Sequence, residues 1–296
     1  MNLAPIALFV YNRPTHTRRS VQALLKNELA RESDLIIFSD APKNVDAEEA
    51  VQQVREYIQT ITGFRSIRIV ERERNWGLAK SIIDGVTTVV NQYGRIIVLE
   101  DDLIITPHFL DFINRALGKY ESEHKVIQVS GYMFPVKIGI EDDTFFLPLT
   151  TSWGWATWKR AWQLFDTDAK GYAQVKTDPA LRKRFNLDGA YDYFLMLEAQ
   201  LAGQIDSWAI RWYLATFLFE GLTLYPRESL VTNVGFEGSG THGLMRGSMS
   251  RSSAREEFVP ESFPDTLSVG ASWQTVCSCL RTRPPWIDRA RRWLRI

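Results

Sequence analysis

Hydrophobic residues alternate between two patterns along the first 130 positions. Short apolar runs indicate buried strands, and longer segments with apolar positions three or four residues apart indicate helices packed on one face. The strands are expected at 5–11, 34–39, 66–71, 95–99 and 126–130, and the helices at about 14–30, 46–62, 77–92 and 107–120. The last helix has the clearest start, with Thr106 as N-cap and Pro107 at its first position. This alternation predicts a Rossmann-like, mostly parallel α/β sheet with flanking helices, whose ligand lies beyond the carboxyl ends of the strands.

The pattern becomes mixed after residue 130. It predicts helices near 156–165, 178–186 and 190–203, a strand near 222–225, a mobile loop over 235–256 and irregular structure over 259–275. We therefore expect three parts. Residues 1–130 form the sheet, residues 131–245 form a second half of the same domain packed against it, and residues 246–296 form a C-terminal extension.

Composition excludes several classes of protein. Of the 296 residues, 35 are Lys or Arg and 35 are Asp or Glu, so the formal net charge is zero and no nucleic-acid partner is expected. Cys277 and Cys279 are too few and too close together for a disulfide framework, which favours a reducing compartment and inert thiols. Because no apolar run is long enough for a secretion signal or a membrane span, we expect a cytoplasmic protein.

Three acidic residues, Glu100, Asp101 and Asp102, directly follow the strand at 95–99. At the carboxyl end of a parallel strand they lie where ligands bind, and their mutual repulsion favours a bound cation. Oxygen ligands of this kind suit Mg²⁺ or Mn²⁺, held by one or two carboxylates together with substrate phosphates. A second acidic triplet at 141–143 has turn-like flanks and is expected to be a solvated loop.

An apolar strand that ends in such a triplet resembles the GT-A glycosyltransferases, and the Glu-Asp-Asp form is most similar to N-acetylglucosaminyltransferase I and its bacterial relatives. The resemblance covers roughly residues 5–245. Further segments that agree with it are Val10–Pro14, Ser39-Asp40, Asn75–Leu78, Ser152–Trp155, Asp206–Trp208, Pro226–Ser229 and Thr241–Gly243. The resemblance implies a GT-A fold with the nucleotide-sugar site in residues 1–130 and the acceptor and catalytic site in residues 131–245.

The resemblance also implies which residues bind the donor and its metal. Asp102 would bind the metal directly, and Glu100 and Asp101 would contact the sugar and the ribose. Asp40 would meet a uracil, which makes a UDP-sugar the expected donor. His242, in a glycine-rich loop, would bind the metal or the diphosphate unless it is an inert loop histidine. The remaining donor contacts are expected from Tyr11, Asn12, Arg13, Asn75, Gly77 and Lys80.

Asp206 is the expected general base, both by the resemblance and because the apolar ring of Trp208 could exclude water from the carboxylate. If Asp206 deprotonates the acceptor hydroxyl, displacement is a single step that inverts the anomeric centre, an outcome that the resemblance implies. Two alternatives stay open. Asp206 could cap the apolar helix that follows it, and Asp192 could be the base instead.

Tryptophans dominate the expected acceptor region. Trp153 and Trp155 flank Gly154, where a sugar-stacking role and plain core packing are both open. Trp158 and Trp162, four residues apart as in a helix, are expected in the core. Arg211 could offset diphosphate charge or form a surface salt bridge. The candidate substrate contacts are therefore Trp153, Gly154, Trp155, Trp208 and Arg211.

The chain ends in a basic segment, 281–296, with six Arg and one Asp. Its apolar residues recur at helical spacing, which suits a helix lying on an anionic membrane surface. A docked terminal helix with a solvated basic face is the alternative.

The acidic triplet and the resemblance together imply a metal-dependent glycosyltransferase, and the resemblance implies that it inverts the anomeric centre. It would move a sugar from a nucleotide-diphosphate donor to a glycan or lipid-linked acceptor in cell-surface polysaccharide synthesis, at the inner face of the membrane. One alternative is a sugar-nucleotide nucleotidyltransferase, although the glycines expected after its first strand are absent from residues 10–16. The other is a non-catalytic glycan-binding protein with the same fold.

Overall fold

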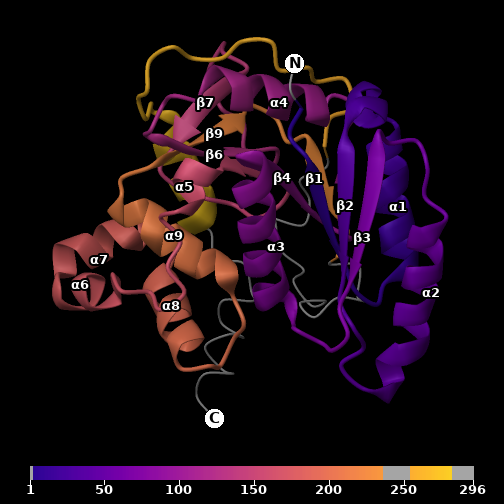
Figure 1. The fold of residues 1–296 in the computed structure, drawn as a ribbon. Coiled ribbons are helices and arrows are strands. Elements are labelled where there is room, and N and C mark those ends of the chain that lie inside the picture. Colours follow the sequence, from indigo (N-terminus) through magenta and orange to yellow (C-terminus); the bar gives the residue numbers. More distant parts are fainter. Residues whose placement is uncertain (1–2, 236–253, 282–296) are drawn as a thin grey trace.

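A mixed eight-stranded sheet forms the centre of the protein, in the order β3-β2-β1-β4-β8-β6-β9-β7 (Figure 1). The structure is a computed structural model, and it describes residues 3–235 and 254–281. The parallel part contains β1 Ile6–Val10, β2 Asp34–Ser39, β3 Ser66–Glu71 and β4 Arg95–Glu100. The rest contains β6 Val126–Ser130, β7 Thr144–Leu147, β8 Trp155–Trp158 and β9 Leu222–Pro226. The five strands expected before residue 131 and the Rossmann-like sheet are confirmed.

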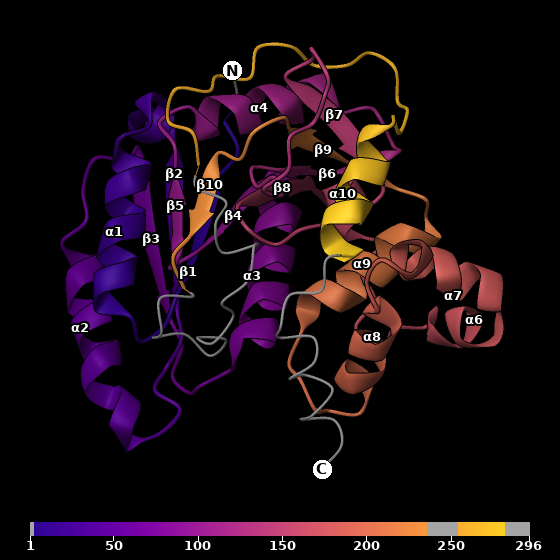
Figure 2. The ribbon, with the colours of Figure 1, turned by 180° about the vertical axis from the view of Figure 1, so that it is seen from behind.

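Helices cover both faces of this sheet because its strands are apolar on both sides. In β1, Ile6 and Leu8 belong to one core cluster, whereas Ala7 and Phe9 belong to the other. The helices against the first cluster are α1 Pro14–Leu25, α2 Glu48–Gln59 and α4 Phe109–Lys119, and α3 Leu78–Tyr93 lies against the second. The helix α9 Trp208–Leu218 contributes residues to both clusters. Figures 1 and 2 show α3 on one side of the sheet and α1 with α2 on the other.

The carboxyl ends of β1, β2 and β4 meet at one edge of the sheet, because these strands are parallel neighbours. A short antiparallel pair, β5 Leu103–Ile105 with β10 Val231–Asn233, lies directly after the acidic triplet. The second half of the chain therefore returns to the edge where the expected donor site lies.

Three helices in the first half are shorter than expected, and one of them, α2, covers only Glu48–Gln59 of the expected 46–62. α1 ends at Leu25 and is followed by a 3₁₀ turn, Glu28–Glu32, so the helix expected over 14–30 is interrupted. α4 begins at Phe109, two residues later than expected. The Phe109 nitrogen donates to the Thr106 carbonyl oxygen at 3.2 Å, and the Thr106 hydroxyl is buried without a partner. Thr106 therefore precedes the helix without capping it through its side chain.

The helix expected over 156–165 is wrong over its first residues. Trp155–Trp158 form β8, which pairs with both β4 and β6, and α5 covers only Lys159–Trp162. A strand between two others satisfies its backbone groups on both sides, and this tertiary pairing overrides the helical spacing of the tryptophans. The helices α7 Pro179–Phe185 and α8 Tyr193–Leu201 confirm two expected helices, and α6 Tyr172–Thr177 is additional.

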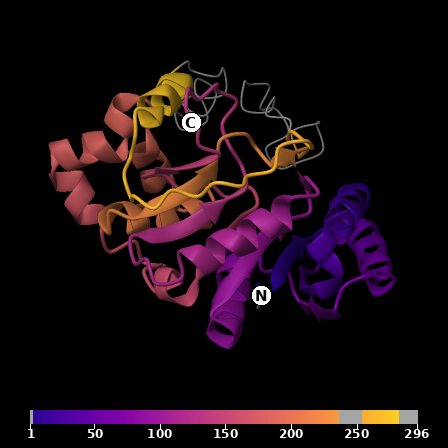
Figure 3. The ribbon, with the colours of Figure 1, turned by 90° about the horizontal axis from the view of Figure 1, so that it is seen from above.

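Residues 254–271, here called the strap, lie against α4 and lead to α10 Ser272–Arg281 (Figure 3). The ring of Phe263 stacks on that of Phe112 with 5.9 Å between centroids, and the Tyr120 hydroxyl donates to the Pro264 carbonyl oxygen at 2.6 Å. Within the strap, the irregular structure expected over 259–275 is confirmed up to Gly270. From Ser272 onward the chain is helical instead.

The second acidic triplet contacts the strap. Asp143 accepts hydrogen bonds from the backbone nitrogens of Glu261 (3.0 Å) and Ser262 (3.1 Å), and it pairs with Arg227. The expectation of a wholly solvated loop is therefore wrong at Asp143. Arg227 also donates to the Glu141 carbonyl oxygen at 2.7 Å, which gives it a structural role.

Within residues 3–235 and 254–281, no helix has the length and apolarity that crossing a bilayer requires. The basic segment predicted to meet a membrane lies, except for Arg281, outside the described residues.

Candidate active site

The acidic triplet lies at the carboxyl end of β4 and is held by α1 and by the loop after β1. Nη2 of Arg13 donates to Oδ1 of Asp101 at 2.6 Å and to Oδ2 of Asp102 at 3.0 Å. The Tyr11 nitrogen donates to Asp101 at 3.3 Å, and the Ser20 hydroxyl donates to the Asp101 carbonyl oxygen at 2.8 Å. The predicted donor residues Tyr11, Arg13 and Asp101 and the predicted metal ligand Asp102 are therefore linked by hydrogen bonds.

The triplet carries more negative charge than Arg13 compensates. Burial, with the charges of Asp102 and Asp101, raises the pKa of Glu100 to about 8, against the opposing effect of Arg13. Burial also raises the pKa of Asp101 to about 6, and Arg13 again opposes it. Burial lowers the pKa of Arg13, but the Asp101 and Asp102 charges outweigh this effect and the net direction is upward. A further cation would be favourable here.

Asp40, the expected uracil contact, holds the loop before α3. Its carboxylate accepts hydrogen bonds from the Ala41, Trp76 and Gly77 nitrogens, each at 2.9 Å. It also accepts one from Nδ2 of Asn75 at 3.1 Å. A carboxylate has about four acceptor positions. The acceptor positions of Asp40 are taken by groups of the protein, so Asp40 holds the 75–77 loop in place. This role differs from the expected contact with a uracil.

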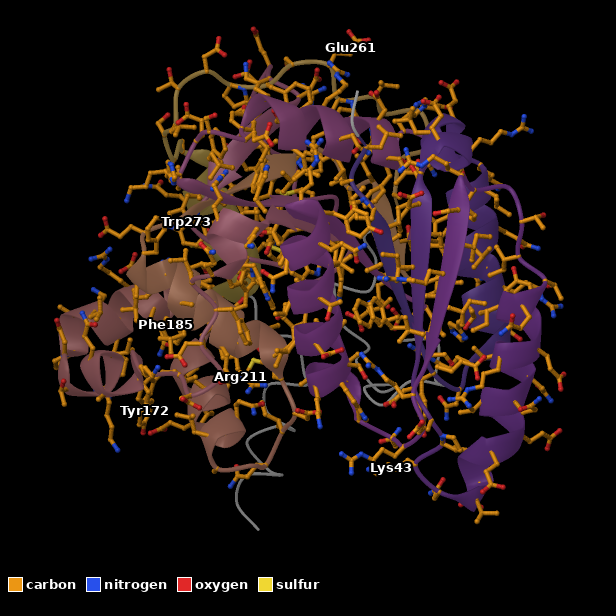
Figure 4. The ribbon with its side chains drawn as sticks, in the orientation of Figure 1. Lys43, Tyr172, Phe185, Arg211, Glu261 and Trp273 are labelled. Carbon is orange, nitrogen blue, oxygen red and sulfur yellow. The ribbon has the colours of Figure 1, made fainter. Side chains whose placement is uncertain are left out.

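The 75–77 loop places Asn75 and Gly77 beside the ends of β1 and β2. Gly77 has φ +74°, a conformation that side chains disfavour, and it immediately precedes α3. Nζ of Lys80 lies 4.4 Å from the centre of the Trp76 ring. Asn12 is half-buried in the loop after β1. The backbone nitrogen of Lys43 donates to the Tyr11 hydroxyl at 3.0 Å. Figure 4 shows Lys43 below the ends of the strands.

Asp206, the expected base, lies at the first turn of α3. Its Oδ2 is 3.4 Å from the Ala79 nitrogen, and a Cβ on Gly77 would come within 3.3 Å of the same oxygen. Asp206 is exposed to solvent. The alternative that Asp206 caps the helix following it is wrong, because the side chain of Ser207 caps α9 through the Ile210 nitrogen. The rival Asp192 caps α8 through the Leu195 nitrogen.

Arg211 lies in the first turn of α9, close enough to Asp206 for the two charges to interact. Burial lowers the pKa of Arg211, and Asp206 opposes this shift. Its Nη1 donates to the Thr167 carbonyl oxygen at 3.3 Å, while its Nε is buried without a partner. In the view of Figure 4, Arg211 and Lys43 lie on either side of α3.

The tryptophans divide differently from the expectation. Trp155 is 0% exposed and Trp208 is 3% exposed, and their rings stack with 5.1 Å between centroids inside the core. Neither ring is open to a sugar in this conformation, so their proposed substrate contact is corrected to core packing. Trp158 and Trp162 are buried as expected. Trp153 is half-buried and packs edge-on against Tyr132, and it stays a candidate for acceptor contact.

Glycines at the two turns near the site are needed for space. Gly154 has φ +64°, and a Cβ there would lie 2.8 Å from Val231. Gly235, which the sequence did not single out, follows β10, and its neighbour Val234 donates to the Asp102 carbonyl oxygen at 2.9 Å. The sequence signal that could have identified Gly235 is a glycine two residues after the short β-rich run 231–233. His242 lies outside the described residues.

The residues present fit a divalent cation whose remaining ligands come from the substrate. Within the described ranges, no group of three His, Cys, Asp or Glu side chains forms a ready metal cage. Mg²⁺ and similar ions, however, commonly bind one or two carboxylates plus phosphates and water. The triplet supplies uncompensated carboxylates, and the absence of a Cβ at Gly235 leaves room beside Oδ2 of Asp102. Asp102, 15% exposed, is the accessible ligand.

Comparison with known proteins gives a match to one family model. Residues 6–142 match the family model described as glycosyl transferase family 2. No curated protein matches the chain. The match supports a glycosyltransferase, while the finer resemblance to N-acetylglucosaminyltransferase I is not confirmed and stays a prediction.

Similar solved structures are remote. TarS of S. aureus is 13% identical, with 79% of this chain and 37% of that chain covered and a TM-score of 0.36. The mannosyltransferase PcManGT of Pyrobaculum calidifontis, in complex with GDP-Man and Mn²⁺, is 12% identical, with 74% and 76% covered and a TM-score of 0.36. Mouse xyloside xylosyltransferase 1 is 11% identical, with 73% and 82% covered and a TM-score of 0.35.

This chain thus spans just over a third of the length of TarS. The family match over residues 6–142, just under half of the chain, together with the acidic triplet at the end of β4 and the Rossmann-like sheet, supports a glycosyltransferase.

Proposed function

We propose that this protein is a glycosyltransferase that moves a sugar from a nucleotide diphosphate to a hydroxyl group of a glycan or lipid-linked acceptor, in the synthesis of a cell-surface polysaccharide. The observation that carries the proposal is the triplet at the end of β4, whose Asp101 and Asp102 contact Arg13. A leaving diphosphate needs positive charge to stabilise it. Carboxylates can hold a metal ion and a guanidinium can bind phosphate oxygens, so a site with both suits a diphosphate that carries a bound metal ion.

On the donor side, Asp102 would hold Mn²⁺ or Mg²⁺, which supplies Lewis-acid stabilisation of the departing diphosphate when bound. Tyr11, Asn12 and Arg13 border the same edge of the sheet and would contact the nucleotide. A UDP-sugar remains the first donor to test. Asp40 supports that choice less than expected, because its oxygens bind the 75–77 loop.

On the acceptor side, Asp206 would accept the proton of the attacking hydroxyl. The acceptor oxygen bonds to the anomeric carbon as the bond from that carbon to the diphosphate oxygen breaks, and the nucleoside diphosphate leaves with the electron pair. One such step inverts the anomeric centre. The position of Asp206 beside the first turn of α3, next to the 75–77 loop of the expected donor side, supports this role.

The test is a panel of UDP-, GDP-, CMP- and dTDP-sugars with Mn²⁺, followed by thermal shift and by assay of the released nucleotide. We expect one nucleotide to stabilise the protein, and we expect release of its nucleoside diphosphate when an acceptor is present. Asp102→Asn is the matched variant and should lose the metal-dependent part of the shift. Release of pyrophosphate from a nucleoside triphosphate and a sugar phosphate would instead indicate the nucleotidyltransferase alternative.

A further inference from the structure

A single nitrogen of Arg13 lies between the two aspartates of the triplet. Nη2 is 2.6 Å from Oδ1 of Asp101 and 3.0 Å from Oδ2 of Asp102. These are charge-assisted hydrogen bonds of short length. The guanidinium therefore supplies the positive charge that these two carboxylates would otherwise take from a bound cation.

A metal ion and this nitrogen would compete for Asp102. Mg²⁺ binds carboxylate oxygens at about 2.0–2.1 Å, closer than the hydrogen-bonded nitrogen. Both would compete for Oδ2, and two positive groups within such a distance repel. The contact with Asp102 is the longer of the two and Asp102 is the more exposed aspartate, so this contact is the one that can open.

The backbone of Arg13 is fixed while its side chain can move. Arg13 is the residue before α1, its carbonyl oxygen accepts from the Thr17 nitrogen at 2.9 Å, and Pro14 follows it. Proline restricts the backbone of the residue before it. The Arg13 side chain is 21% exposed, so the guanidinium has a route toward solvent.

We propose that Arg13 is a resident counter-cation of the triplet, which competes with the divalent metal for Asp102 and so weakens metal binding in the free protein. A nucleotide diphosphate offers the displaced guanidinium a new anionic partner and the metal new oxygen ligands. Metal binding thereby becomes dependent on the donor. This inference rests on the proposed function, because it takes Asp102 as the metal ligand.

The experiment measures Mn²⁺ binding to the full chain without nucleotide, by calorimetry and by the electron paramagnetic resonance signal of free Mn²⁺. Arg13→Gln should bind Mn²⁺ at least about tenfold more tightly than the wild type, a change of about 1.4 kcal/mol. Arg18→Gln is the matched control. It removes the same charge from α1 at a residue that contacts the ring of Tyr57 at 5.0 Å, and it should leave the affinity unchanged.

Equal Mn²⁺ affinities for the wild type and Arg13→Gln would overturn the inference. The proposed function would survive that result if Mn²⁺ with UDP still bound in a manner that Asp102→Asn abolishes. Failure of both proteins to bind Mn²⁺, with or without UDP, would overturn the inference and the metal dependence together.

A measurement on the wild type covers the case in which Arg13→Gln does not fold. The guanidinium resonances of Arg13 can be followed by nitrogen-detected NMR while Mg²⁺ and UDP are added. We expect restricted guanidinium rotation in the free protein and a clear change of these resonances as Mg²⁺ binds with UDP. Unchanged Arg13 resonances during Mg²⁺ binding that depends on Asp102 would overturn the inference.

Discussion

Gly235 lies directly against the carboxylate of Asp102. A Cβ added to Gly235 would come 2.2 Å from Oδ2 and 3.0 Å from Cγ of Asp102. Real Cβ atoms do not approach other atoms this closely, so any side chain at 235 would push the carboxylate aside. The close approach joins the end of β10 to the triplet after β4, although more than a hundred residues separate them in the chain.

Gly235→Ala should weaken metal and donor binding with little loss of stability. The extra methyl group displaces the Asp102 side chain, whereas the fold around it can stay intact. We expect Mn²⁺ affinity in the presence of UDP to fall at least about tenfold, equivalent to about 1.4 kcal/mol. Gly118→Ala is the control, because a Cβ there meets nothing within 4 Å. Unchanged affinity in Gly235→Ala would show that Asp102 does not need its present position.

Asp206→Asn should retain donor affinity and lose turnover. A lost general base typically reduces the rate by about 10²–10⁴-fold. Asp192→Asn is the matched comparison, since asparagine also serves as a helix cap and the rate should change little. Steady-state and single-turnover assays with the accepted nucleotide sugar measure both effects. A near-normal rate for Asp206→Asn would exclude it as the base.

Asp40→Ala should destabilise the protein by about 3 kcal/mol, since a buried charged acceptor serves donors from the 75–77 loop. Urea denaturation measures this loss in the absence of ligand. Asp142→Ala, in the exposed part of the second triplet, is the control and should change stability by about 0.5 kcal/mol or less. If Asp40→Ala keeps its stability and loses only discrimination between uridine and other nucleotides, Asp40 contacts the nucleobase as the sequence predicted.

The metal-free protein should lose stability as the pH rises toward 8. The folded-state pKa of Glu100 is raised to about 8, so between its ordinary value and 8 the folded protein holds a proton that the unfolded chain has released. The free energy of unfolding then falls with rising pH, by up to about 1.4 kcal/mol per pH unit for one proton. Glu100→Gln should flatten this slope in denaturation series with a chelator. An equally steep slope in the variant would place the titrating group elsewhere.

Deletion of residues 282–296 should weaken binding to anionic vesicles, because it removes five of the six arginines of the basic segment. Sedimentation with vesicles of anionic and of neutral lipid measures this, and neutral vesicles provide the control. Equal binding of both proteins to anionic vesicles would favour a terminal helix that docks on the protein.

Several features of the site follow from local sequence. The apolar run at 95–99 and the acids after it sufficed to predict a buried strand ending at the ligand edge, and β4 with Glu100, Asp101 and Asp102 confirms this. Burial of Trp158 and Trp162 also follows from their size and apolarity. Their secondary structure does not follow from local sequence. Their spacing indicated one helix, whereas Trp158 ends the strand β8, which pairs with β4 and β6.

The sequence by itself determined the strands of the first half, the helices between them and the edge that carries the acids, because periodicity and apolar runs act between near neighbours. Only the tertiary structure decided which partners the polar groups find. Arg13 meets Asp101 88 residues away, Asp40 holds Gly77, and Asp206 reaches Ala79 across 127 residues. Hydrogen bonds and ion pairs at such separations depend on how helices and strands pack, and no local pattern encodes them.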